Sequence, residues 1–228
     1  MTQEILYDTC PSCRQGTVRL QDILYQCSDC GLILKKSKQF MFLSAGKYEV
    51  VKLGTGSSGV AEQAMQGQVF TPELLKITLN NIYSDEQLEQ LAAGNQSILR
   101  PVTTILAGII LEQLREDCFV EVRGIRRAHG PTLTGEHGYR PIVEIPTKEL
   151  TWQDEGNLFC TTNRLVMPSN KFTFIRLGRK VSVVRAFRNG IAIQLKKENF
   201  ATYFVGGLPH EAAVMAAYVI GKLPKPRK

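Results

Sequence analysis

The sequence contains little that indicates catalysis, secretion or membrane insertion. It has only three histidines in 228 residues. Its longest apolar run, near residues 102–111, is well short of the ~20 residues that a membrane-spanning helix requires. The first residues lack the positively charged start and the long apolar core of a secretory signal. We therefore expect a soluble, cytoplasmic protein that is not an enzyme and has no small-molecule substrate.

The histidines and glycines support this expectation. His129 and His137 flank a glycine-rich loop that also contains Glu136, and a histidine beside a carboxylate can act as a general base. Exposed loop histidines explain the same pattern, because no nucleophile accompanies them. His210, near a predicted helix start, is expected to be a surface or capping residue. Residues 54–59 match G-x-G-x-x-G, but no βαβ pattern follows, so we expect a flexible linker.

Cysteine is concentrated near the N-terminus. Cys10 and Cys13 form one C-x-x-C pair, and Cys27 and Cys30 form a second pair after thirteen intervening residues. This is the ligand spacing of a tetrahedral structural zinc site. Four thiolates fill the coordination shell and leave no open position for catalysis. The sequence therefore predicts one structural Zn²⁺ that stabilises a small zinc ribbon.

Two alternatives to zinc are disfavoured. A redox C-x-x-C pair belongs near a βαβ pattern, and one pair is enough for that chemistry. A disulfide framework needs an oxidising compartment, and the expected location does not provide one. The remaining cysteines, Cys118 and Cys160, lie in apolar surroundings, and we expect them to be buried and unreactive.

The rest of the chain divides by its hydrophobic period. A zinc ribbon is expected over residues 1–38, and a hairpin with a Gly/Ser linker over residues 39–70. Helix signals fill residues 71–117: Thr71 before Pro72, a capping box at Ser84, and an apolar helix after Pro101. A β domain is expected over residues 118–222 and a basic tail over residues 223–228.

The β domain is predicted to contain seven short strands and one terminal helix. Asn189 and Gly190 give a good type I′ hairpin signal, and the helix begins at Pro209. We expect strands at residues 118–125, 139–145, 156–167, 172–177, 181–187, 191–196 and 201–205. Such an order indicates a small antiparallel barrel or sandwich that the helix closes at one end.

Two segments of this domain resemble the pleckstrin-homology-like (PH-like) superfold, including its bacterial GRAM-like members. Residues 156–166 (GNLFCTTNRLV) resemble its G-x-L-x-x-T-x-x-R-L-[IV] segment, and residues 190–193 with 203–204 resemble its G-I-x-I and Y/F-F segments. As a whole, the chain resembles uncharacterised bacterial zinc-ribbon proteins of a cyanobacterial type. The resemblance implies an α+β protein: a zinc ribbon, a small helical middle segment and a PH-like antiparallel β-barrel capped by a helix.

Charge is distributed unevenly. Residues 61–120 contain eight acids and three bases, whereas residues 171–188 contain six bases and no acid. This asymmetry indicates an anionic partner, although a solvated face explains it too. In a strand, Phe172 and Phe174 share one face, which we expect to be core. The predicted contact patch comprises Lys171, Arg176, Arg179, Lys180, Arg185 and Arg188.

These observations favour a non-enzymatic adaptor, or an assembly or regulatory factor. We expect it to dock on a protein complex, with an anionic lipid surface as a further partner, since the resemblance implies phospholipid headgroups as ligands. A cyanobacterial host would make this surface the thylakoid. The alternative is a nucleic-acid-binding zinc-ribbon protein, associated with transcription or RNA, because the sequence pI of about 9.1 fits an electrostatic footprint.

Overall fold

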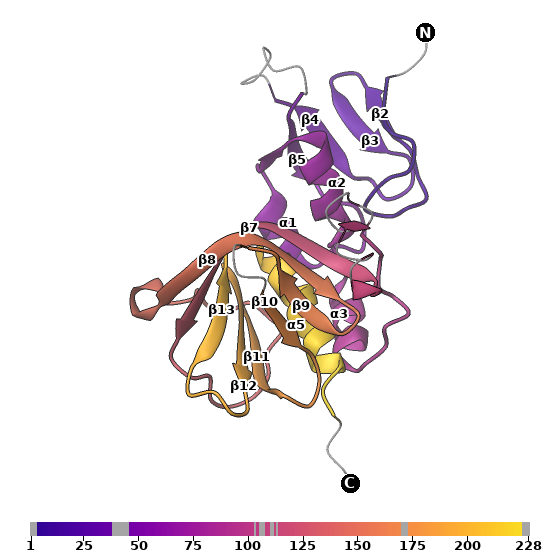
Figure 1. The fold of residues 1–228 in the computed structure, drawn as a ribbon. Coiled ribbons are helices and arrows are strands. Elements are labelled where there is room, and N and C mark those ends of the chain that lie inside the picture. Colours follow the sequence, from indigo (N-terminus) through magenta and orange to yellow (C-terminus); the bar gives the residue numbers. More distant parts are fainter. Residues whose placement is uncertain are drawn as a thin grey trace. The chain divides into compact units, whose positions relative to one another are not determined.

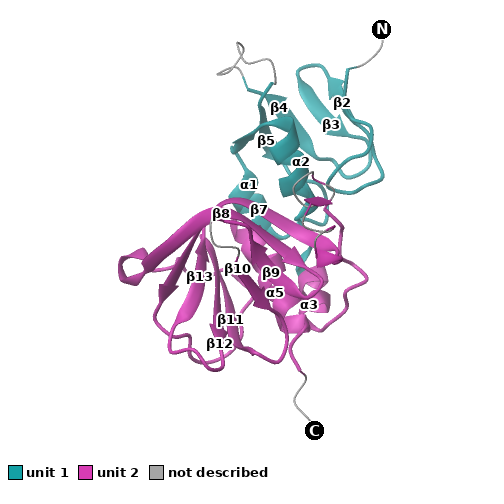
Figure 2. Ribbon diagram, viewed as in Figure 1, with its two compact units in different colours: residues 1–85 teal, residues 86–228 magenta. Residues whose placement is uncertain are grey.

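The chain folds into two compact units, each built around an antiparallel sheet. The computed structural model describes residues 4–37, 46–102, 104, 108–109, 112, 114–169 and 173–224. The units are Met1–Asp85 and Glu86–Lys228 (Figure 2). No helix in these described ranges is both long and apolar enough to cross a membrane.

The N-terminal unit contains a six-stranded sheet in which every strand pairs with the next one along the chain (Figure 1). The expected zinc ribbon and the segment that follows it share this sheet, because β4 pairs directly with β5. The first strand of the hairpin expected around residue 45 lies outside the described residues. The strands are β1 (Ile5–Tyr7), β2 (Val18–Gln21), β3 (Leu24–Cys27), β4 (Ile33–Lys36), β5 (Tyr48–Lys52) and β6 (Val69–Phe70).

Two helices complete this unit, and both begin at a side-chain cap. In α2 (Pro72–Asn80) the Thr71 hydroxyl accepts a hydrogen bond from the Leu74 N–H, which confirms the predicted start. In α1 (Gly59–Met65) the buried Ser58 hydroxyl accepts from the Ala61 N–H. Helix α1 falls where the sequence predicted a flexible linker, so this glycine-rich run leads into ordered structure.

The C-terminal unit contains a seven-stranded sheet that curls into a half-barrel (Figure 1). The strand order is β10-β9-β8-β7-β13-β12-β11, so a four-strand meander and a three-strand meander meet where β7 pairs with β13. The strands are β7 (Cys118–Gly130), β8 (Thr151–Thr161), β9 (Arg164–Met167), β10 (Thr173–Arg176), β11 (Val181–Phe187), β12 (Gly190–Leu195) and β13 (Ala201–Val205).

The predicted number of strands in this unit is right because two errors cancel. The strand predicted over residues 139–145 is an irregular loop, and the isolated bridge to Arg185 is formed by Gly138, just before it. Pro141 and Pro146 lack the N–H groups that a continuous ladder needs. The single strand predicted over residues 156–167 is instead β8 and β9, with a turn at Thr162 and Asn163. The predicted hairpin at Asn189 is confirmed.

Helix α5 (Pro209–Gly221) ends the unit as predicted and packs against β7, β11 and β12. Its residues are buried almost throughout, and Tyr218 donates a hydrogen bond to the Thr162 carbonyl (2.8 Å). His210 is only 2% exposed, so the expectation of a surface residue was wrong. A helix that is apolar on all sides buries its first turn as well.

The other predicted helices have mixed outcomes. Helix α3 (Asp85–Ala92) follows Ser84, and the chain reverses at Gly94, whose φ is +98°. A Cβ on Gly221 would lie 2.2 Å from the Leu91 carbonyl oxygen, so glycine allows α5 to approach this segment. The helix predicted after Pro101 falls largely outside the described residues, and so does most of the basic tail.

Strand β10 corrects one prediction about the core. Phe174 is 53% exposed, and its neighbour Ile175 is buried. The sequence assigned the face of Phe174 to the core, and this assignment was wrong for that residue. The prediction used the correct two-residue alternation of a strand, but it assigned the wrong face of β10 to the core. Phe172 and Lys171 lie outside the described residues.

Candidate metal centre

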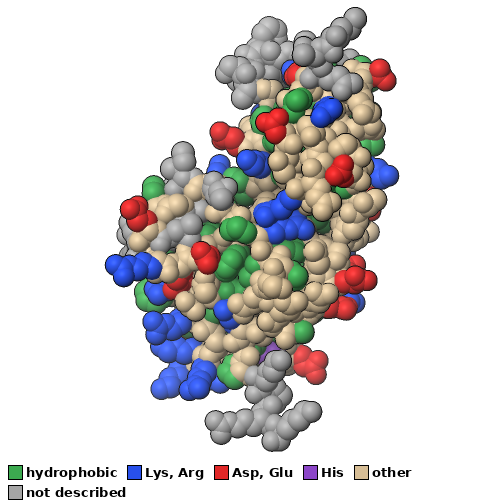
Figure 3. Space-filling model, turned by 90° about the vertical axis from the view of Figure 1, so that its right-hand side faces the viewer, with side chains coloured by type: hydrophobic (Ala, Val, Ile, Leu, Met, Phe, Trp, Pro, Cys, Tyr) green, Lys and Arg blue, Asp and Glu red, His purple; other side chains and the backbone are tan. Residues whose placement is uncertain are grey.

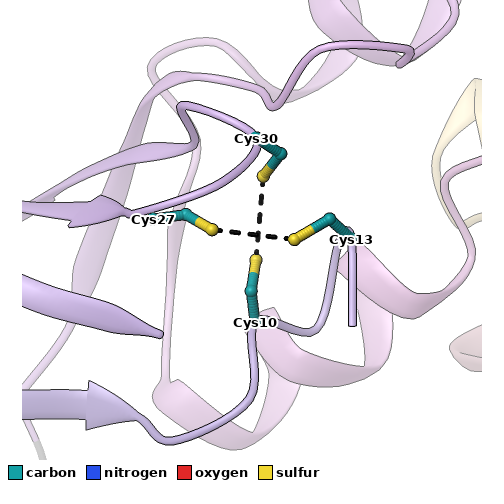
Figure 4. A group of neighbouring side chains, drawn as sticks. All are labelled: Cys10, Cys13, Cys27 and Cys30. Atoms are coloured by element: carbon teal, nitrogen blue, oxygen red, sulfur yellow. Dashed lines mark hydrogen bonds between the residues drawn. The ribbon is translucent and has the colours of Figure 1, made fainter. Parts of the chain in front are cut away.

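Four cysteine sulfurs from two turns converge on one point (Figure 4). The sulfurs of Cys10, Cys13, Cys27 and Cys30 all lie within 4.8 Å of one another, and three of these residues are buried. The Sγ–Sγ distance is 3.9 Å between Cys10 and Cys30, and 3.6 Å between Cys13 and Cys27. All four are free thiols and not disulfides. The group could therefore hold a metal ion.

The first turn is closed by backbone hydrogen bonds around Cys10. The Arg14 N–H donates to the Cys10 carbonyl (2.7 Å), and the Cys10 N–H donates to the Gly16 carbonyl (2.6 Å). Arg14 has a φ of +62°, a left-handed conformation that directs the chain back over the cysteines. A Cβ on Gly16 would lie 2.6 Å from the Cys27 sulfur, so a side chain here would disturb the cluster.

The second turn, which contains Cys27 and Cys30, bends back in the same way as the first. Gly31, the residue after Cys30, also has a left-handed φ of +71°. The Asp29 N–H lies 3.4 Å from the Cys27 sulfur, in position to donate to a thiolate. Glycine allows this conformation at little cost, whereas Arg14 adopts it in the first turn against its usual preference.

A second layer comes from the glycine-rich run after β5. The Thr55 N–H donates to the Cys30 carbonyl (2.7 Å). A Cβ on Gly54 would lie 2.5 Å from the Cys30 sulfur. The sequence assigned this run to a linker, but its glycine lets the backbone pass directly against the cluster. The glycine-rich run itself was the one signal in the sequence, because glycine permits a close approach of the backbone, but the sequence does not show that Cys30 is the group approached.

The metal-free thiols differ in acidity. Burial raises the pKa of Cys10, and burial raises the pKa of Cys30 to about 11. Burial also acts on Cys13, but the N–H groups of Gln15 and Gly16 stabilise its thiolate and lower its pKa to about 7. At neutral pH the cluster therefore retains protons until a cation displaces them.

The arrangement suits a structural role. If all four sulfurs coordinate one ion tetrahedrally, no position remains for water or substrate. Lewis-acid chemistry at the ion would require one of these ligands to leave.

The residues of the predicted contact patch do not all lie together. Arg179 and Lys180 are exposed in the turn before β11, and Arg188 is exposed after it. The seven residues of β11 separate Lys180 from Arg188 by roughly 25 Å. Arg185 donates to the carbonyls of Thr134 (2.9 Å) and Glu136 (3.4 Å), so it holds the β7–β8 loop. Arg176 is exposed in β10, and Lys171 lies outside the described residues.

Two lysines outside the predicted patch lie beside Arg179 and Lys180. The Lys196 N–H donates to the Lys180 carbonyl (2.9 Å), so the turn after β12 adjoins the turn before β11. Lys196 and Lys197 are both exposed. The sequence search for an acid-free basic stretch ended at Arg188 and missed them. Figure 3 shows a face of the molecule on which lysine and arginine side chains gather toward the lower left.

The remaining titratable candidates have structural partners. His129 stacks on Phe200, with 4.1 Å between the ring centroids. The Nδ1 of His137 accepts a hydrogen bond from the Val184 N–H (3.3 Å). Cys118 and Cys160 are buried, as predicted, and burial raises the pKa of Cys118 to about 12 and that of Cys160 well above its usual value.

Comparison with protein-family models, with curated proteins and with solved structures gave no match. The functional argument therefore depends on the residues themselves.

Replacing Gly54 by alanine should weaken metal binding. The added methyl would collide with the Cys30 sulfur, and changes to groups that orient metal ligands typically cost 10–100-fold in affinity. Competition with a chromophoric chelator measures the affinity. Gly59→Ala is the matched control, because no atom lies within 4 Å of its added Cβ. Equal affinities for the two variants would show that Gly54 does not support the site.

Metal affinity should rise steeply with pH. At pH 7 the raised pKa values keep Cys10 and Cys30 protonated in the metal-free protein, so binding displaces at least these two protons. Bound metal is therefore lost as the pH falls, and the apparent affinity should rise by roughly a hundredfold or more between pH 7 and pH 8. Chelator competition at both pH values tests this, and a pH-independent affinity would contradict it.

Proposed function

We propose that the N-terminal unit is a zinc ribbon that holds one structural Zn²⁺ through Cys10, Cys13, Cys27 and Cys30. Thiolate is the preferred ligand set of structural zinc, with Zn–S distances of about 2.3 Å. A regular tetrahedron with that radius has edges of about 3.8 Å. The Cys10–Cys30 and Cys13–Cys27 sulfur separations, 3.9 and 3.6 Å, lie on either side of this value, and all four sulfurs lie within 4.8 Å of one another.

We further propose that the C-terminal unit is a PH-like domain. Its seven strands run in the order that a four-strand and a three-strand meander produce, and a buried C-terminal helix packs on the sheet. The segments that carry the resemblance fall on β8 and β9, on β12 and on β13. Fold alone does not establish an activity, least of all for a widespread fold.

The function that these properties support best is that of a non-enzymatic, zinc-dependent adaptor in the cytoplasm. The closed four-thiolate cluster carries this proposal, because a site without an open position stabilises a surface and performs no reaction. Two small units with rigid sheets offer docking surfaces for a protein complex. An anionic membrane is a further surface that exposed cations can approach.

Nucleic-acid binding is the second candidate. Four exposed cations, Arg179, Lys180, Lys196 and Lys197, occupy two adjoining turns of the C-terminal unit. None of the four ion pairs found among the described residues involves them. Such a group could neutralise phosphates, and its binding would then depend strongly on salt.

Zinc analysis tests the first proposal. The purified protein should contain one zinc per chain by mass spectrometry of the metal, and Cys10→Ser should lose it, since three thiolates hold the ion far more weakly. Cys118→Ala serves as the control, because this buried cysteine belongs to the other unit and its loss leaves the ligands intact. Full zinc in Cys10→Ser would disprove the ligand set.

Affinity isolation from a native extract tests the adaptor function. The wild-type chain should recover a specific protein partner, and replacing Arg176, Arg179 and Lys180 by alanine should reduce its recovery several-fold, because all three are exposed cations. A Lys35→Ala/Lys36→Ala variant controls for charge loss elsewhere. If instead no protein is recovered and duplex DNA binds with a log–log salt slope of roughly −3 to −4, the second candidate replaces the adaptor.

A further inference from the structure

The two edge strands of the seven-stranded sheet, β11 and β10, differ in how their outward backbone groups are hydrogen-bonded. Strand β11 forms one edge, and residues 137–143 of the β7–β8 loop cover it. Three N–H groups of this edge donate to the loop: Val184 to His137 Nδ1, Ala186 to Gly138 and Arg188 to Val143, at 3.3, 2.7 and 2.9 Å. The β7–β8 loop therefore supplies hydrogen-bond acceptors for these three N–H groups of the β11 edge.

Strand β10 forms the opposite edge. Among the residues that the structure describes, it pairs only with β9, over Thr173 to Arg176. In an antiparallel pair, every second residue directs its N–H and C=O groups away from the partner strand. An edge of this kind is a template for pairing with another extended chain.

The outer face of β10 carries one apolar and one cationic side chain. Phe174 is 53% exposed, Arg176 is exposed, and Ile175 between them is buried. Arg164 lies directly opposite Arg176 on β9, where two like charges repel each other. Glu116 compensates only Arg164, through a contact of 2.8 Å. No ion pair of Arg176 occurs within the described ranges, so its charge remains available to a partner.

We propose that β10 is a docking strand for an extended segment of a partner protein, which adds to the sheet beside Phe174 and Arg176, where no further strand is found among the described residues. On the outer face, cross-strand neighbours of the added segment lie beside Phe174 and Arg176, two residues apart. Complementarity requires an apolar side chain next to Phe174 and a carboxylate next to Arg176. The segment therefore reads apolar-x-acidic, or the reverse for the opposite strand direction. This inference rests on the proposed adaptor function and specifies its surface.

A purely protective edge explains these features less well. Short length and a charged residue both discourage unwanted strand pairing, and β10 has both. Protection does not explain an exposed phenylalanine on the same strand, because apolar surface at an edge promotes pairing. Phe174 also lies 5.6 Å from the Arg164 guanidinium, which supports its ring from the β9 side.

Three synthetic peptides test the proposal against the full-length, zinc-loaded chain. Each has ten residues of alternating threonine and valine, with Leu-Thr-Glu, Leu-Thr-Lys or Ser-Thr-Glu at its centre. Fluorescence polarisation should show that the first binds about tenfold more tightly than either of the others. Hydrogen exchange should slow at the amides of β10 when the first peptide binds.

Variants at the two edges provide the control. Phe174→Ser and Arg176→Glu should each weaken binding of the Leu-Thr-Glu peptide about tenfold, and Arg176→Glu should now prefer the Leu-Thr-Lys peptide. Ile142→Ser and Arg188→Glu change an exposed apolar residue and an exposed cation at the covered edge, and should leave binding unchanged. Equal effects at both edges, no preference among the peptides, or no binding at all would each overturn the proposal.

The same variants separate this inference from the adaptor function. If the wild-type chain recovers a partner from extract and the Phe174→Ser and Arg176→Glu variants recover it equally, docking occurs elsewhere and only the β10 proposal fails. If the wild-type chain recovers no partner, the adaptor function itself fails.

Discussion

Four sulfurs within 4.8 Å of one another cannot all be ionised unless a cation lies between them. The local structure of the N-terminal unit follows from this constraint. Both turns bend back through a left-handed residue, Arg14 or Gly31, and glycines at positions 16 and 54 leave space for the sulfurs. The strands of this sheet are five residues long or shorter, and an ion held by the four sulfurs would add to the stability that such short strands provide.

The sequence predicted correctly that these four cysteines come together, because the signal for it is local. Two C-x-x-C pairs define both turns without reference to the rest of the chain. Gly54 was missed because its role depends on a contact with Cys30 from a different part of the chain. Local signals also gave the starts of α2 and α5 and the hairpin at Asn189. Spacing therefore predicts the cysteine cluster and its turns, whereas a residue that contacts the cluster from another part of the chain, such as Gly54, is identified only in the fold.

The errors in the C-terminal unit have a common cause. Alternation in a strand gives the period but not the face that points inward, and Phe174 was placed on the wrong face for this reason. The segment at residues 139–145 is apolar enough for a strand, but its prolines interrupt the ladder and it covers an edge instead. His210 was expected at the surface because the burial of the first turn of α5 depends on the sheet beneath it.

The basic stretch shows why proximity in sequence is a poor guide to a contact surface. A strand places consecutive turns at opposite ends of the sheet, so Lys180 and Arg188 are separated by the whole of β11. The antiparallel neighbour β12 brings Lys196, which is distant in sequence, next to Lys180. Arg185, in the middle of the strand, is used to hold the loop that covers this edge. The position of each cation on its strand therefore decides its role: Arg185 stabilises the fold, whereas the cations at the turns and Arg176 on β10 are exposed.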